Sequence, residues 1–172
     1  MHDTRNIVLV GFMGSGKSST GRYVAERLDR PFLDMDTEIE RREGRSIPDI
    51  FAQQGEPHFR QLERALVQEL AARASLVIAP GGGIVLNPDN VRDFAARGVV
   101  INLRVSPEMV LSRVGQDPHR PLLQGADPLQ RIRDLMARRK DLYAAVPYQI
   151  DTDGLTPEAV GDLVLDLFAR TP

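Results

Sequence analysis

A glycine-rich segment near the N-terminus decides the fold class of this chain. It follows the short apolar run Asn6-Ile-Val-Leu-Val10 directly and reads Gly11-Phe-Met-Gly-Ser-Gly-Lys-Ser18. This is the P-loop pattern, in which glycines let backbone N–H groups point at phosphate oxygens while the next helix adds its positive end. We expect Lys17 to reach the β and γ phosphates of a nucleotide and the Ser18 hydroxyl to bind Mg²⁺.

The rest of the chain alternates short apolar runs with segments of helical spacing, which predicts an α/β fold. The runs are rich in Val, Ile and Leu and do not alternate strictly, as is typical of strands buried in a parallel sheet. We expect strands at 6–10, 31–34, 76–79, 99–103 and 148–151. We expect helices near 17–28, 37–43, 47–54, 57–73, 88–97, 107–114, 128–144 and 157–169.

Composition excludes several classes of function. The 172 residues suit one domain, and 22 Lys and Arg against 24 Asp and Glu give no basic excess for nucleic acid. The chain has no Cys, and its three His are scattered, so no disulfide, thiolate nucleophile or Cys-bearing zinc site is expected. No apolar stretch approaches a bilayer span and no signal segment is evident, so we expect a cytoplasmic protein without membrane contact.

Residues 115–127 combine Gly, Pro and charge between two predicted helices, and this connection is long for a compact domain. Such loops often act as lids. Arg120 within it could close over the phosphates and neutralise charge that develops in the transition state.

Four further motifs narrow the class of P-loop protein. No Asn-Lys-x-Asp segment for guanine is present. The motifs are Asp34-Met-Asp36, Gly55-Glu-Pro-His-Phe-Arg-Gln-Leu-Glu63, Gly81-Gly82-Gly83 and Arg120-Pro-Leu-Leu123. Together with the P-loop they resemble the shikimate kinase family, and the resemblance runs from Ile7 to about Val160.

The resemblance implies a fold, a reaction and a set of ligands. It implies a three-layer P-loop kinase fold of the nucleoside-monophosphate-kinase type, with a five-stranded parallel sheet flanked by helices and a mobile lid. Residues 1–172 would form one domain with the P-loop at 11–18, a substrate-binding region at about 34–62 and the lid at about 115–127. The reaction would be transfer of the ATP γ-phosphoryl group to the 3-hydroxyl of shikimate, with Mg²⁺, by a monomer.

The resemblance also assigns roles to individual residues. Asp34 would hold the Mg²⁺ sphere with Ser18, and Asp36 would orient or deprotonate the attacking hydroxyl. Arg60 and Arg139 would clamp the shikimate carboxylate, as planar guanidinium groups can do bidentately. Nucleotide contacts would come from the P-loop and from residues near adenine, and substrate contacts from a glycine run: Gly11, Gly14, Ser15, Gly16, Lys17, Ser18, Ser19, Arg113, Arg120 and Pro157 for the nucleotide, and Gly81, Gly82 and Gly83 for the substrate.

Each assignment has a plainer alternative. One of Asp34 and Asp36 could cap a helix that starts at Thr37. Arg60 could be an i to i+3 partner of Glu63. Arg138 could replace Arg139 as the clamp, and Arg113 and Pro157 could be ordinary helix residues, as Ser15 and Ser19 could be turn and surface residues.

The sequence departs from the family pattern in three places, at Met35, at His58 and at Val146-Pro147. These departures leave the reaction class more secure than the substrate. A kinase for another polyol or sugar acid such as gluconate, and an ATP-binding sensor without turnover, are therefore the alternatives.

Overall fold

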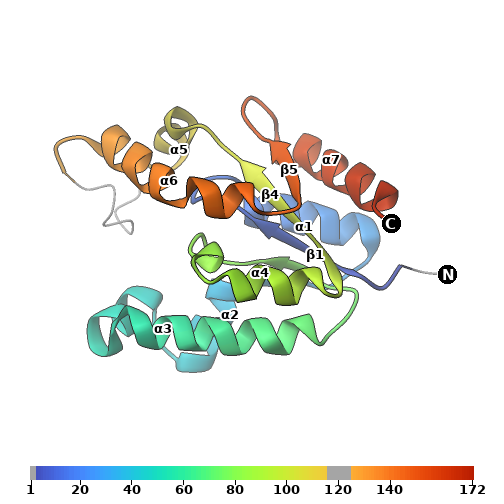
Figure 1. Cartoon of the computed structure of the whole chain (residues 1–172), viewed down its shortest axis with the longest axis horizontal. Helices are drawn as coiled ribbons and strands as arrows, with labels where there is room; N and C mark the ends of the chain where they lie inside the picture. The colour runs from blue at the N-terminus through green and yellow to red at the C-terminus, as the bar shows by residue number, and fades with distance from the viewer. Residues whose placement is uncertain (1–2, 116–124) are drawn as a thin grey trace.

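The computed structural model describes residues 3–115 and 125–172 as a central parallel sheet with helices on both faces (Figure 1). The strands are β1 (Asn6–Val10), β2 (Phe32–Asp34), β3 (Val77–Ala79), β4 (Gly98–Arg104) and β5 (Tyr148–Asp151). All the pairings are parallel and the order is β2-β3-β1-β4-β5. The predicted five-stranded parallel sheet is confirmed.

The helices lie close to their predicted positions. They are α1 (Lys17–Leu28), α2 (Met35–Glu43), α3 (Ile47–Ala71), α4 (Pro88–Ala95), α5 (Pro107–Val114), α6 (Pro128–Ala144) and α7 (Pro157–Arg170), with a 3₁₀ turn η1 (Ile84–Leu86). The two helices expected at 47–54 and 57–73 form α3, which is interrupted at Gly55 by non-helical φ and ψ of 82° and 165°. Helix α2 begins two residues earlier than expected, at Met35.

Alternate residues of the strands build two cores on opposite faces of the sheet. Val8, Ile78 and Val100 face one side and pack against residues of α2, α3 and α4. Ile7, Leu9 and other alternate residues face the other side, where α1 and α7 cover them. The inner strands β1, β3 and β4 are thus buried on both faces over most of their length, which is why their sequences are apolar without alternation, whereas the edge strands β2 and β5 are only partly buried.

The carboxyl ends of β1, β2 and β3 meet at one edge of the sheet. The P-loop follows β1, Asp34 ends β2, and the Gly81–Gly83 run follows β3, so these predicted site segments come together there. Beside them Phe12 packs with residues of α5 and α6, including Val110 and Ile132. Of the predicted lid, 116–124 with Arg120 lies outside the described residues. No helix of the part that the structure describes is long and apolar enough to cross a bilayer.

Candidate active site

The P-loop curls around the ammonium group of Lys17. Gly14 and Gly16 have φ of 72° and 86°, a region that side chains disfavour. Gly16 caps α1 without a side-chain hydrogen bond, so the amides of the first turn face the loop. The Lys17 ammonium donates to the carbonyls of Gly11 and Phe12 at 2.7 and 3.1 Å. Positive charge is thereby concentrated where a polyphosphate would lie.

Asp34 joins the P-loop helix to the start of α2. Its Oδ1 accepts a hydrogen bond from the Thr37 amide at 3.2 Å and so caps α2. Its Oδ2 accepts from the Ser18 hydroxyl at 2.7 Å. The capping alternative therefore holds for Asp34, which also contacts Ser18.

The Ser18 and Asp34 oxygens fit a magnesium ion. Mg²⁺ binds oxygens at roughly 2.0–2.1 Å, so two oxygens 2.7 Å apart can contact one ion. Across residues 3–115 and 125–172, no group of three or more His, Asp or Glu side chains is arranged to hold a metal. A site of one hydroxyl and one carboxylate, completed by phosphate and water, is how Mg²⁺ is usually held in phosphotransferases.

The carboxyl group of Asp36 is not fully hydrogen-bonded among the described residues. It lies in the first turn of α2, and its Oδ1 is buried without a hydrogen-bond partner among the described residues. Burial, with the neighbouring charge of Asp34, raises the pKa of Asp36, while Lys17 and Arg60 act against this rise. A buried acceptor of this kind is costly unless a ligand satisfies it.

A hollow of about 360 Å³ connects these groups. Its walls are the P-loop from Met13 to Ser19, the acids Asp34 and Asp36, and residues 80–82 after β3. The P-loop, Ser18 with Asp34, and Asp36 therefore line one space.

The Gly81–Gly83 run closes the other side of this space. A Cβ atom at Gly81 would lie 2.8 Å from Asp36 Oδ1, and one at Gly83 would overlap the Arg60 guanidinium. The Gly82 carbonyl accepts hydrogen bonds from Tyr143 Oη at 2.5 Å and from Arg139 Nη1 at 3.3 Å. A side chain at Gly81 or Gly83 would therefore displace the Asp36 carboxylate or the Arg60 guanidinium.

Arg60 and Arg139 approach the glycine run from two different helices. Arg60 donates to Glu63 Oε1 at 2.9 Å and to Glu56 Oε1 at 3.2 Å, so its predicted alternative as an i to i+3 partner is also real. Glu63 is only 2% exposed, and burial raises its pKa although Arg60 and Arg139 favour the ionised form. Arg138 is exposed, whereas Arg139 is half-buried beside Gly82.

Other predicted nucleotide residues lie around the P-loop. Arg113 Nη1 donates to the Gly14 carbonyl at 2.7 Å, which places it at the loop. Ser15 is buried, and its hydroxyl has no partner among the residues described, whereas Ser19 is exposed on α1. Pro157 is the exposed first residue of α7, behind the Thr156 cap.

Glu63 and Tyr143 were missed as site residues by sequence reasoning. Both belonged to segments that were recognised, the Gly55–Glu63 motif and the end of α6, but neither spacing indicated a contact with the glycine run. The signal available for Glu63 was a carboxylate one helical turn after Arg60. No local signal marked Tyr143, because its partner Gly82 lies 61 residues away.

The fold and the site define a small P-loop kinase. The shikimate kinase family model matches residues 13–168. The shikimate kinase of Thermodesulfovibrio yellowstonii is 40% identical over 166 residues, which cover 96% of each chain. The solved shikimate kinase of Acinetobacter baumannii, in complex with shikimate, is 42% identical with a TM-score of 0.90 and covers 96% of this chain and 93% of that one.

The chain belongs to the shikimate kinase family. It is a transferase that uses ATP to phosphorylate shikimate, a step of aromatic amino acid biosynthesis. A gluconokinase from Sinorhizobium meliloti shares the fold with a TM-score of 0.55, but at 16% identity that likeness shows the fold alone.

Proposed function

We propose that the residues at the P-loop edge of the sheet transfer the γ-phosphoryl group of ATP to the 3-hydroxyl of shikimate. The observation that carries this assignment is the position of Asp36, which lines the same hollow as the P-loop and the glycine run and whose buried Oδ1 has no hydrogen-bond partner among the described residues. A substrate hydroxyl that donates to this oxygen would lie beside the groups that bind phosphate.

The P-loop holds the donor phosphates. Backbone amides and the α1 N-terminus bind the phosphate oxygens, and Lys17 neutralises the group in transfer. Ser18 and Asp34 would hold Mg²⁺, which supplies charge neutralisation between the β and γ phosphates when it is bound. Arg113, Ser15, Ser19, Arg120 and Pro157 remain proposed nucleotide contacts.

Arg60 and Arg139 form the proposed carboxylate clamp. They reach the glycine run from α3 and α6, and Asp36 and Arg60 lie directly against Gly81 and Gly83. Gly81, Gly82 and Gly83 remain proposed substrate contacts. Glu63 holds the Arg60 guanidinium in place through a hydrogen bond within the protein. A carboxylate bound by two guanidinium groups fixes the ring, so that one hydroxyl is directed at Asp36.

Asp36 accepts the hydrogen bond of the attacking hydroxyl. It orients this hydroxyl in line with the phosphoryl group and takes its proton as the new bond forms. We further propose that the chain is one domain and acts as a cytoplasmic monomer.

The comparison of Asp36→Asn with Asp34→Asn tests these assignments. The first keeps the shape but removes the charge, and we expect turnover to fall by about two orders of magnitude with little change in Mg-ATP affinity. The second should weaken the Mg²⁺ dependence of the reaction. Coupled ADP release and nucleotide titration give both quantities, and an Asp36→Asn enzyme of normal activity would refute the catalytic role.

A further inference from the structure

A second hollow lies under α6, away from the phosphate site. Its volume is about 610 Å³, larger than the hollow at the P-loop, and it is bounded by α6, by β4 with the segment that follows it, and by Gln149 of β5. One face of α6 forms its wall, with residues at three- and four-residue spacing: Arg133, Met136, Ala137, Lys140, Tyr143 and Ala144. It shares Phe12 with the P-loop, but none of the side chains proposed for phosphoryl transfer lines it.

The hollow exists because small side chains on this face of α6 leave space between the helix and the sheet. Ala137 and Ala144 stand two turns apart and are both exposed, so neither fills the space towards the sheet. The Met136 side chain, the Tyr143 ring and the Phe12 ring supply apolar surface around them. A flat apolar body fits such a space, which has the volume usual for small-molecule sites.

The polar side chains at the base of the hollow form hydrogen bonds within the protein. Asn102 Nδ2 donates to Gln149 Oε1 at 2.7 Å. Gln149 Nε2 in turn donates to the carbonyls of Tyr143 and Val146, each at 2.9 Å. The side chain of Gln149 is therefore satisfied within the protein, and the ligand need not carry a polar group at this end.

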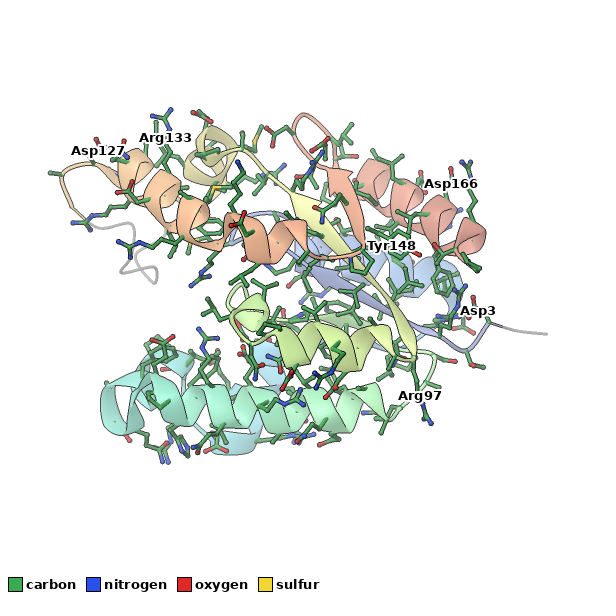
Figure 2. All side chains as sticks on the ribbon, in the orientation of Figure 1. Asp3, Arg97, Asp127, Arg133, Tyr148 and Asp166 are labelled. Carbon is green, nitrogen blue, oxygen red and sulfur yellow. The ribbon has the colours of Figure 1, made fainter. Side chains whose placement is uncertain are left out.

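The charges at the edge of the hollow favour an anion. Arg104 pairs with Asp151 and Arg133 pairs with Glu108, each at 2.6 Å, and Figure 2 shows Arg133 on α6 where that helix passes α5. The side chain of Lys140 has no ion-pair or hydrogen-bond partner within residues 3–115 and 125–172. One positive charge is therefore left over, beside an apolar wall.

We propose that this hollow is a second ligand site that binds a small aromatic monocarboxylate. The ring lies between α6 and β4, against Met136, Tyr143 and Phe12, and the carboxylate pairs with Lys140. Two charged contacts to one acid group are not available, since the neighbouring guanidinium groups are already paired.

The site is joined to the substrate site through Tyr143. The ring of Tyr143 lines the hollow, while its hydroxyl donates to the Gly82 carbonyl, which also accepts from Arg139. A ligand that packs against this ring holds α6 and the glycine run in their present arrangement. Its occupancy then strengthens shikimate binding, a consequence that rests on the proposed Arg139 clamp.

Binding is tested with 2-naphthoate on the intact chain, by calorimetry and by amide shifts in NMR spectra without nucleotide or turnover. We expect a dissociation constant of about 1 mM for the unmodified protein, as is usual for a ligand of this size. Lys140→Glu should weaken the binding of 2-naphthoate by about tenfold or more, and Ala137→Phe, which fills the hollow, should abolish this binding. Arg138→Glu is the matched control because Arg138 is exposed on the same helix and does not line the hollow.

No binding, or equal weakening by Arg138→Glu and Lys140→Glu, would overturn the site. Should Ala137→Phe fold poorly, Ala144→Leu fills the same space with less volume and is expected to weaken binding in the same direction.

The link is tested by titrating shikimate with and without saturating 2-naphthoate. We expect shikimate to bind about fivefold more tightly with the probe, and the probe to gain the same factor from shikimate. Tyr143→Phe should remove this factor while the probe still binds. If the probe binds but shikimate affinity does not change, the link between the two sites is refuted, while the second ligand site itself stands. Failure of the clamp proposal is thereby distinguished from failure of the second site.

Discussion

At the scale of the residue, the site pairs two buried carboxylates with two guanidinium groups. Asp36 and Glu63 each have a raised pKa because burial disfavours their charge, and the charge of Arg60 opposes both shifts. Arg139 adds a second positive charge near Glu63. A substrate carboxylate would enter a cluster whose cations are already held in place, so little side-chain ordering is needed on binding.

Arg60→Ala should chiefly raise the KM for shikimate, by about ten- to a hundredfold, because a charged hydrogen bond is lost. Methyl shikimate, whose carboxylate is neutral, should suffer a similar loss on the unmodified enzyme. The two changes together should cost much less than the product of the separate losses, since they remove one contact.

Initial rates over the four combinations check this cycle. Arg64→Ala is the control, because Arg64 lies on the same helix but pairs with Asp93. Fully multiplicative losses would place the carboxylate elsewhere.

Glu63 and Glu69 should have opposite effects on stability as the pH changes. The raised pKa of Glu63 means that its folded carboxyl holds its proton more tightly, so the stability it contributes is present below its unfolded value of 4.5 and is lost as the pH rises through the folded pKa. The pKa of Glu69 is lowered by its hydrogen bond to Arg42, so its contribution is present above 4.5 and lost as the pH falls through the folded pKa.

Urea unfolding at pH values below and above 4.5 measures how the free energy of unfolding changes with pH. The difference between each variant, Glu63→Gln or Glu69→Gln, and the unmodified chain gives the contribution of that glutamate. If the two contributions changed with pH in the same direction, burial would not be the cause of the raised pKa at Glu63.

At the scale of the element, the interruption of α3 sets the direction of Arg60. Gly55 lies at φ 82° and ψ 165°, a backbone region almost closed to residues with a side chain. Pro57 opens the second half of the helix two residues later, and Phe59 and Arg60 follow in the next turn. The break lets the start of α3 and its longer second half take different directions around the substrate region.

Gly55→Ala should lower the free energy of unfolding by about 1–3 kcal/mol, because the strained backbone must be retained or the helix must be redirected. The KM for shikimate should rise with it. Gly44→Ala is the matched control, since Gly44 also has positive φ and open space but lies in the milder left-handed region at the end of α2. Chemical unfolding and initial rates measure both effects, and an equal KM change in the two variants would contradict the role of the break.

The elements were largely predictable, whereas their contacts were not. Caps at Ser106 and Thr156 followed by proline marked the starts of α5 and α7, because capping is decided within four residues. The start of α2 was less predictable, because Asp34 both ends β2 and caps α2, so the helix follows the strand without the connection that the sequence suggested. The approach of Arg60 to Gly83 and of Tyr143 to Gly82 depends on the order of the strands, which no local pattern encodes.

At the scale of the whole molecule, the residues that form the core are largely distinct from those that form the candidate active site. The two cores fill both faces of the sheet with largely aliphatic side chains, while the site lies beyond the ends of three strands and is built from the loops and helices that meet there. Loops at this edge are where ligands bind in open α/β sheets. Changes in the site should therefore alter activity far more than stability.

Lys17→Met should reduce turnover by about a hundredfold or more, while the midpoint of urea unfolding changes little. In the proposed mechanism the ammonium neutralises phosphate charge, whereas the glycine backbone and α1 keep the loop in place. Arg22→Met is the control, because Arg22 is exposed on the same helix and stacks on Phe32. Coupled ADP release with urea titration gives both values, and near-normal turnover would exclude the role assigned to Lys17.

The glycine run after β3 also has an evolutionary consequence. A side chain at position 81 would displace the Asp36 carboxylate, and one at position 83 would displace the Arg60 guanidinium. Each glycine is thus tied to a partner more than 20 residues earlier in the chain. We expect the replacement of either glycine alone to disturb its partner, so a change of acceptor specificity should involve paired replacements of a glycine and the acid or the arginine beside it.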